Sequence, residues 1–291
     1  MSAGSPHLEQ PLEQSDDLAA GDELIIRPAR KGIGIDFAEI ARYRELLVFL
    51  TWRDLKVRYK QTALGFAWAV LQPLFSLFAF SLIFGKFAQI PSDGLPYPVF
   101  AFAGMLPWMF FQNCVVLGGQ SLVNQQQVIT KVYFPRLFVP AASVGVGLVD
   151  LLISLVLFGI VLVAFGVKPS WYLLLLPVPL LLAVMFTLGV TCYVAALTVT
   201  YRDLRYAVPF VMQFWMYLSP VIYPARIFPG HWRWILFLNP MSGIIDACRA
   251  CVAGRSFHLQ SLAFATAGSI VALVFGFRNF ARMERRFADI A

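Results

Sequence analysis

Residues 139–165 read VPAASVGVGLVDLLISLVLFGIVLVAF, and Asp150 is the one charged side chain among them. A helix needs about 20 largely apolar residues to cross the hydrocarbon layer, because its buried amides must bond within their own segment. Each central apolar residue contributes about −0.3 to −0.6 kcal/mol to insertion, and a central charge costs about +2.5 to +3.5 kcal/mol. This stretch therefore predicts a membrane-spanning helix in which the Asp150 carboxylate faces protein or water.

Five other runs satisfy or approach the same requirement, at residues 64–85, 99–123, 172–199, 206–223 and 259–277. The composition agrees, since 59% of the residues are hydrophobic and 13% are charged. A soluble domain carries roughly 45–50% and about 25% of these classes. We predict an all-α membrane protein with six transmembrane helices.

The positive charges predict how the chain is oriented. Of the 23 Lys and Arg residues, 17 lie in the two termini and in the connections that share their side of the six runs. Because Lys and Arg concentrate in cytoplasmic segments, both termini should be cytoplasmic in a multi-pass protein of a bacterial inner membrane. The net charge of +7 is explained by these flanking positions, so it does not indicate nucleic-acid binding.

Three segments outside the runs have compositions of their own. Residues 1–35 are acidic and lack an apolar signal-peptide core, which predicts a disordered cytoplasmic extension. Residues 36–62 predict an amphipathic helix lying in the membrane interface, and residues 281–291 predict a basic cytoplasmic tail. The apolar stripe of that helix is expected to comprise Ile40, Tyr43, Leu47, Leu50 and Val57.

The segment 219–255 is interrupted by four prolines, at positions 220, 224, 229 and 240. Proline removes a backbone donor and breaks a helix interior, so short re-entrant helices between the fifth and sixth spans are expected. Broken backbone at membrane depth is tolerated where protein buries it or where it lines a wet cavity. This segment is therefore a pointer to a pathway or a gate.

Several chemistries find no support in the residues. The 291 residues contain no G-x-x-x-x-G-K-[ST] loop, and the predicted membrane interior has almost no ionisable group besides Asp150, which argues against ion coupling. A membrane-embedded transferase needs convergent acids, whereas Asp93, Asp150, Asp203 and Asp246 are scattered. A passive channel and a subunit driven by another protein remain open.

Short motifs distributed along the chain carry a family resemblance. The most specific is WRDLKVRYK at residues 52–60, followed by Leu64-Gly65, Trp68 and LQP at 71–73. Weaker elements follow in order: Pro98, Gly104, Trp108, KVYFPR at 131–136, YRDL at 201–204, SPVIY at 219–223 and NPM at 239–241. Over residues 39–286 the chain resembles the permease subunit of ABC-2 type exporters of cell-surface polysaccharides, which include O-antigen, capsule and teichoic acid exporters.

The resemblance implies a homodimer bound to two copies of a separate ABC ATPase. ATP and Mg would bind that partner, and no cofactor is expected in this chain. Residues 63–280 would form the ABC-2 type transmembrane domain, and the connection at 121–136 would dock on the ATPase. The residues implied in ATPase coupling are Gln125, Gln126, Gln127, Lys131, Arg136, Arg202, Asp203 and Arg205. Alternatively, Lys131 and Arg136 serve only as topology charges.

The implied substrate is an undecaprenyl-type lipid-linked glycan, whose sugar rings stack on aromatic side chains. Candidate path residues are Trp68, Phe75, Trp108, Trp215 and Tyr217. Candidate contacts to the lipid phosphate are Arg53, Arg58 and Lys60, although anchoring to anionic membrane lipids explains these cations equally well. A capsule, teichoic acid, drug or simple lipid substrate is the alternative within the same family.

Overall fold

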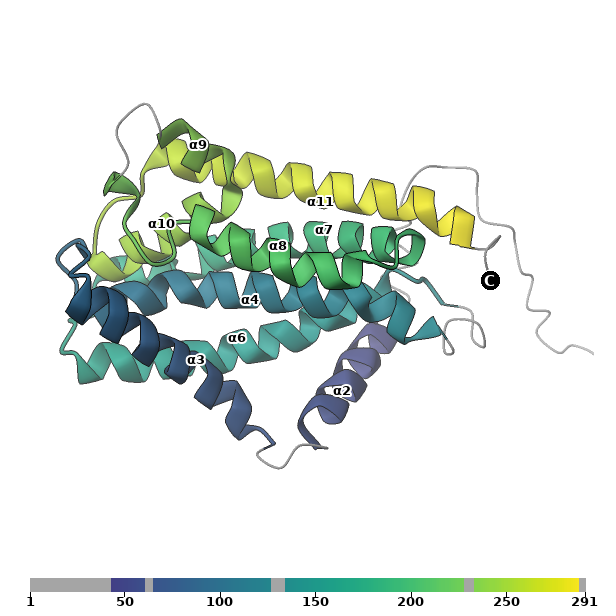
Figure 1. Ribbon diagram of the computed structural model, residues 1–291, viewed down its shortest axis with the longest axis horizontal. Coiled ribbons are helices and arrows are strands. Elements are labelled where there is room, and N and C mark those ends of the chain that lie inside the picture. The colour runs from purple at the N-terminus through teal and green to yellow at the C-terminus, as the bar shows by residue number, and fades with distance from the viewer. Residues whose placement is uncertain (1–42, 61–64, 127–133, 228–232, 288–291) are drawn as a thin grey trace, which may run out of the picture. The chain divides into compact units, whose positions relative to one another are not determined.

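The computed structural model describes residues 43–60, 65–126, 134–227 and 233–287, and it is helical throughout, with no strand in these ranges (Figure 1). Its elements are α2 (Arg44–Lys60), α3 (Ala67–Phe80), the π-helix η1 (Ser81–Phe87), α4 (Tyr97–Asn124), α6 (Phe138–Ala164), η2 (Trp171–Leu175), α7 (Pro177–Thr200), α8 (Leu204–Leu218), η3 (Ala225–Ile227), α9 (Arg233–Leu238), α10 (Pro240–Ala253) and α11 (Leu259–Phe287).

Five helical segments of the described chain are long and apolar enough to cross a membrane. They are Ala67–Phe87, Tyr97–Asn124, Phe138–Ala164, Trp171–Thr200 and Leu259–Glu284. These segments coincide with five of the six predicted runs, which confirms an all-α membrane protein. The remaining run, 206–223, falls on α8, whose 15 residues extend about 22 Å, less than the roughly 30 Å of the hydrocarbon layer. The six-span count stays a prediction.

Helix α4 is the centre of the bundle and the most deeply buried of the five segments. It packs against α6, α7, α8 and α10, and Figure 1 shows it between α6 and α8. Helix α11 packs on α7, where Gly189 meets Gly276 so closely that a Cβ on either would collide with the backbone of the other helix. Small residues permit this close approach. Helices in a membrane associate through such packing because the lipid provides no hydrophobic driving force between them.

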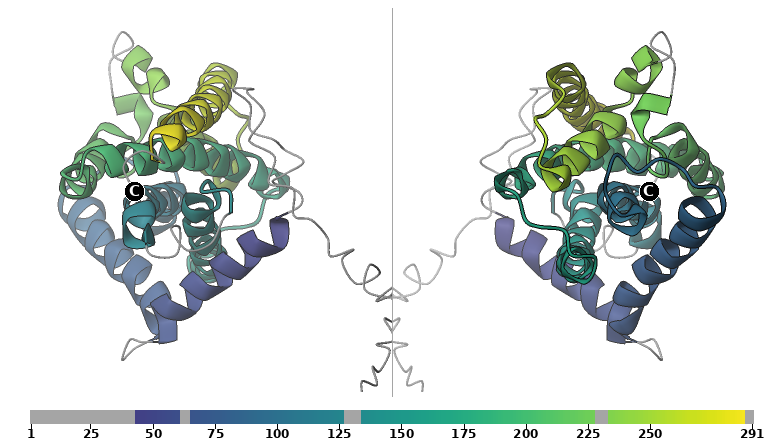
Figure 2. Two further views of the ribbon diagram at one scale, coloured as in Figure 1. Left: turned by 90° about the vertical axis from the view of Figure 1, so that its right-hand side faces the viewer. Right: turned by 90° about the vertical axis from the view of Figure 1, so that its left-hand side faces the viewer.

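Helix α2 packs mainly against α6, and Figure 2 shows it meeting α3 at an angle at the edge of the bundle. Leu50 is buried in a cluster with Phe134, Phe138 and Phe280. Apolar side chains also point away from this cluster, among them Val57, which is exposed although the sequence assigns it to the same stripe. Apolar groups on two sides suit a helix that touches both the bundle and lipid. Residues 36–42, 61 and 62 of the predicted helix lie outside the described residues.

The proline-interrupted segment forms short helices, with α9 at six residues and α10 at 14. Pro240 occupies the first turn of α10, the Asn239 side chain accepts a hydrogen bond from the backbone N–H of Met241, and Gly254 ends the helix with φ +66°. Helix α10 extends about 21 Å, too short to cross the hydrocarbon layer, yet most of its side chains are buried. The position of α9 and α10 relative to the membrane remains a prediction. So do the disordered extension expected at residues 1–35 and the basic cytoplasmic tail expected at residues 281–291.

Candidate functional site

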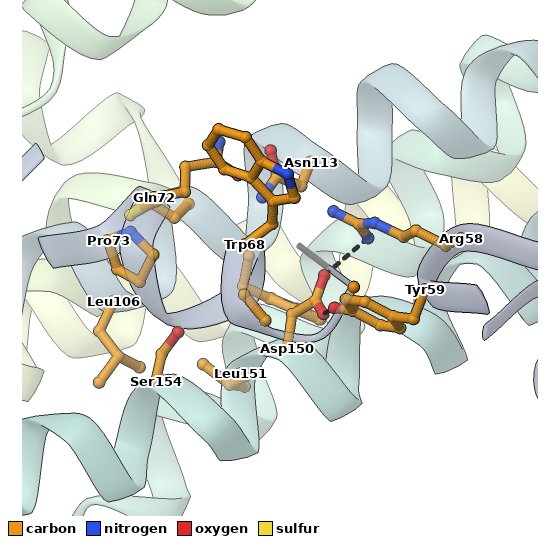
Figure 3. Close-up of a pocket in the computed structure, with 14 residues that line it drawn as sticks. Arg58, Tyr59, Trp68, Gln72, Pro73, Leu106, Asn113, Asp150, Leu151 and Ser154 are labelled. Carbon is orange, nitrogen blue, oxygen red and sulfur yellow. Dashed lines mark hydrogen bonds and ion pairs between the residues drawn. The ribbon is translucent and has the colours of Figure 1, made fainter. Parts of the chain in front are cut away.

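Polar residues from three membrane-spanning helices and from α2 converge on one pocket (Figure 3). Its volume is about 210 Å³. The lining comprises Arg58 and Tyr59 of α2, Gly65, Trp68, Ala69, Gln72 and Pro73 at and near α3, Leu106, Met109, Phe110 and Asn113 of α4, and Asp150, Leu151 and Ser154 of α6. Polar side chains inside membrane segments mark substrate or ion pathways by default, so this pocket is the candidate site.

Asp150 anchors one wall of the pocket by accepting two hydrogen bonds from α2. Arg58 Nη1 lies 2.7 Å from Asp150 Oδ2, and the Tyr59 hydroxyl donates to Asp150 Oδ1. The Arg58 and Asp150 side chains are 33% and 17% exposed, so the ion pair is partly shielded from solvent. Burial, followed by the bond and the charge of Asp150, raises the pKa of Tyr59 above its ordinary value. The carboxylate therefore faces protein, as its place in an apolar run indicates.

The other polar groups of the pocket have no such partners. Among the described residues, the side chains of Gln72, Asn113 and Ser154 make no hydrogen bond, although each can both donate and accept. Trp68 lines the same pocket as Asn113 (Figure 3), and it is 49% exposed. Sequence reasoning selected Arg58 and Trp68 but missed the three neutral polar residues. A signal is present, because each is a polar residue within a largely apolar run.

A second polar network joins α2 to the end of α4. Arg53 Nη2 donates to Gln125 Oε1 at 2.6 Å and to Asp54 Oδ1 at 2.7 Å. Gln125 Nε2 in turn donates to Asp54 Oδ2 at 3.2 Å. The structure thus brings Gln125, an implied coupling residue, onto Arg53, an implied lipid-phosphate contact. Lys60, the last residue of α2, is exposed.

The two implied coupling regions lie next to each other. Gln120 Nε2, near the end of α4, donates to the backbone oxygen of Arg205 at 3.2 Å. Arg202 and Asp203 form the turn between α7 and α8. Arg205 lies in the first turn of α8, and its guanidinium is 4.7 Å from the ring centroid of Tyr206. Arg136 precedes α6 and is half-buried. Gln126 ends the described part of this connection, and Gln127 and Lys131 lie outside it.

The five predicted path residues occupy two different environments. Trp68 and Phe75 of α3 and Tyr217 of α8 are exposed. Trp108, in contrast, is buried inside the bundle, where its ring packs 6.5 Å from that of Trp215, and its Nε1 donates to Gln112 Oε1 at 2.8 Å. Three of the five residues therefore have a free surface, whereas Trp108 and Trp215 pack against each other within one chain.

Arg249 of α10 is a buried charge. From sequence it is only one of the Lys and Arg residues outside the 17 that are assigned to the cytoplasmic side. Its guanidinium donates to four backbone oxygens, those of Phe100 (3.3 Å), Pro220 (2.6 Å), Val221 (2.6 Å) and Tyr223 (3.2 Å). It also lies 3.6 Å from the centroid of the Phe100 ring. Burial lowers the pKa of Arg249 to about 10, so the side chain stays charged at neutral pH. We call Arg249 and these four oxygens the arginine clamp; it ties the 219–223 turn to α4 and α10.

Comparison with known proteins identifies the family to which this arrangement belongs. The family model described as "ABC-2 type transporter" matches residues 45–252. The chain belongs to the ABC-2 type transporter family. This ABC-2 type chain is 34% identical over 215 residues to the O-antigen export system permease protein RfbA of Myxococcus xanthus, covering 73% of this chain and 82% of the relative.

Two further relatives extend the match to other transport systems. An O-antigen export system permease protein RfbA of Klebsiella pneumoniae is 29% identical over 252 residues, or 84% of this chain and 95% of the relative. The polysialic acid transport protein KpsM of Escherichia coli is 21% identical over 240 residues, or 80% and 91% of the two chains. The ABC-2 type chain is thus a multi-pass membrane subunit of a transporter, and the predicted family is confirmed.

Proposed function

We propose that this chain is the transmembrane permease of an ATP-driven exporter that moves a lipid-linked, O-antigen-like polysaccharide out across the bacterial inner membrane. The observation that carries the proposal is the match, over 84% of the chain, to a protein named as an O-antigen export permease. The neutral polar groups of the pocket support it, since hydroxyl-rich sugars bond to such side chains.

Motor activity would come from a separate ABC ATPase that carries ATP and Mg. The end of α4 and the first turn of α8 are joined by the bond from Gln120 to Arg205, which gives the ATPase one continuous polar surface to dock on. At the same end of α4, Gln125 accepts a hydrogen bond from Arg53 of α2. A push on this surface would reach α2 directly. Arg202 and Asp203 complete the proposed docking surface.

Two copies of the chain would enclose the glycan path. Exposed aromatic side chains lie on α3 and α8, namely Phe75, Phe78, Phe210, Phe214 and Tyr217. Sugar rings present C–H faces that stack on aromatic rings, and such contacts bind without fixing one sugar in place. A homodimer that faced these two helices toward each other would line a path in this way, with Phe75 and Tyr217 among the lining residues.

The lipid carrier of the glycan would approach along α2. Arg53 and Arg58 are already paired with Asp54 and Asp150, whereas Lys60 is exposed at the end of the helix. Lys60 therefore makes the first contact with an undecaprenyl-type phosphate, Arg53 exchanges partners later, and Arg58 stays paired with Asp150. Both termini would be cytoplasmic, which places α2 at the leaflet where the lipid-linked glycan is assembled.

Deletion of the gene in its host tests the proposal. The expected result is loss of surface polysaccharide and accumulation of lipid-linked polymer inside the cell, with both restored by the wild-type allele. A reporter fused to the N-terminus should be active only in the cytoplasm. Unchanged surface polysaccharide, accompanied by increased sensitivity to a drug, would favour the drug-export alternative. A reporter active outside the membrane would contradict the orientation.

A further inference from the structure

The pocket between α2, α3, α4 and α6 carries an inference that rests on the proposed function. We propose that it is a binding site for one uncharged sugar unit of the glycan, present in the wall of each copy of the chain. Sugar recognition would thus occur within a single protomer as well as along the path between two protomers.

The hydrogen-bonding capacity of the pocket is the first argument. Gln72, Asn113 and Ser154 have no hydrogen-bond partner among the described residues, and because Gln72 is exposed and the other two are half-buried, their polar groups are available to a ligand. These side chains come from three different helices and face one cavity (Figure 3). Each offers both a donor and an acceptor, which matches the sugar hydroxyl, a group that also donates and accepts.

The charge of the pocket is the second argument, and it separates a sugar from a phosphate. Among the described residues that line the pocket, Arg58 is the one cation, and its guanidinium is 2.7 Å from the Asp150 carboxylate. The pair leaves the pocket neutral, and an incoming phosphate would meet the negative carboxylate beside its only cation. An uncharged ligand meets no such repulsion, and free lone pairs of Asp150 can accept from its hydroxyls.

The size of the pocket and its position are the third argument. A volume of about 210 Å³ is below the roughly 300–1,000 Å³ of pockets for drug-sized ligands, so the cavity suits a single sugar ring. Asp150 lies twelve residues after Phe138, about 18 Å along α6 and close to its midpoint. A sugar unit from any part of the polymer can occupy this position, whereas the phosphates stay at the end that is joined to the lipid.

Trp68 supplies the remaining element of a sugar site. Trp68 lines the pocket together with Asn113 and is 49% exposed, so a pyranose can stack on its ring while the sugar hydroxyls bond to the amides. Leu106, Leu151 and Pro73 provide an apolar floor for the C–H groups of the ring. An aromatic face, convergent amides and a carboxylate are the chemistry by which proteins hold neutral sugars.

Binding of a soluble probe to the purified permease–ATPase complex tests the inference. The probe is the oligosaccharide released by mild acid from the host's own surface polysaccharide, and saturation-transfer NMR detects it even when binding is weak. Asn113→Leu and Gln72→Leu should each weaken binding about 2- to 10-fold, the effect of one lost hydrogen bond. Trp68→Ala should weaken it similarly, and Trp68→Phe, which keeps an aromatic ring, should restore most of it.

The matched control is Asn279→Leu, which makes the same change on a half-buried position of α11 away from the pocket. Its oligosaccharide binding should equal that of the wild type. Inorganic pyrophosphate serves as the second probe, and its binding should not respond to Asn113→Leu. Wild-type binding of the oligosaccharide by all three pocket variants would overturn the inference. The inference would also be overturned if the pocket variants lost pyrophosphate binding and kept oligosaccharide binding, because the pocket would then be a phosphate site.

Failure of this inference can be distinguished from failure of the proposed function. If the wild-type complex binds the oligosaccharide and the pocket variants bind it equally well, only the location of the site is wrong. If the wild-type complex binds no oligosaccharide and the gene deletion leaves surface polysaccharide intact, the proposed function fails.

Discussion

Replacing Arg249 by methionine removes the charge from the arginine clamp and keeps the length of the side chain. The substitution abolishes four donated hydrogen bonds, to the backbone oxygens of Phe100, Pro220, Val221 and Tyr223. Three of these oxygens belong to the 219–223 turn, which has no helical ladder of its own. We therefore expect the turn to lose its attachment to α4 and α10.

The magnitude follows from the burial of these groups. Leaving a buried acceptor unbonded costs about 1–3 kcal/mol, and three acceptors of the turn lose their donor. Removing the desolvation cost of the guanidinium offsets part of this loss, so the net destabilisation should be about 3–5 kcal/mol. For a domain of this size, each kcal/mol lowers Tm by about 2–4 °C. Arg249→Met should lower Tm by about 6–20 °C, and Arg249→Lys, which retains a charge but fewer donors, by less.

A thiol-reactive fluorescent dye provides the assay, because all four cysteines are free and buried. Cys248 and Cys251 flank Arg249 on α10, so the dye reports loosening around the clamp as well as global unfolding. Heating the detergent-solubilised protein should give earlier labelling of the variant. A Tm within about 2 °C of the wild type, with no faster labelling of Cys248, would refute the structural role assigned to Arg249.

Three further changes test other contacts. Asp150→Asn should lower the free energy of unfolding by about 1–2 kcal/mol, a value that allows for the partial exposure of its ion pair. It should also make α2 more sensitive to protease. Proteolysis at the wild-type rate would contradict the anchoring role of Asp150. Gly276→Val should prevent stable folding because its Cβ meets backbone, whereas Gly159→Val, with open space around its Cβ, should fold normally, as measured by monodisperse elution in detergent. Lys131→Glu combined with Arg136→Glu should reduce co-purification of the ATPase, and unchanged co-purification would leave these residues as topology charges.

The membrane-spanning helices could be predicted from sequence because insertion depends on the apolarity of each segment by itself. The run 206–223 shows the limit of this reasoning. Its apolarity continues through Tyr223, yet α8 ends at Leu218 because Ser219 precedes a proline and takes an extended conformation with ψ 143°. The residue before proline is restricted to such conformations, and hydropathy does not register this restriction.

The site could be predicted only in part, because its contacts join residues that are distant in sequence. Asp150 stands out as the one charge of its run, but its partner Arg58 lies 92 residues away, and only the packing of α2 on α6 brings them together. Trp68 and Trp108 both resemble path residues by type. They differ because Trp108 lies on α4, which α6, α7, α8 and α10 surround, so its ring is buried whereas Trp68 is exposed. Only the tertiary structure shows this difference.

Reconstitution tests the central claim that the chain transports glycan only when driven by a separate ATPase. Purified chain is inserted into vesicles that contain the lipid-linked glycan, with or without the ATPase and ATP, and glycan reaching the opposite leaflet is measured by its accessibility to a glycan-degrading enzyme. The account predicts transfer only when chain, ATPase and ATP are all present. Transfer or ATP hydrolysis by the chain alone would contradict it.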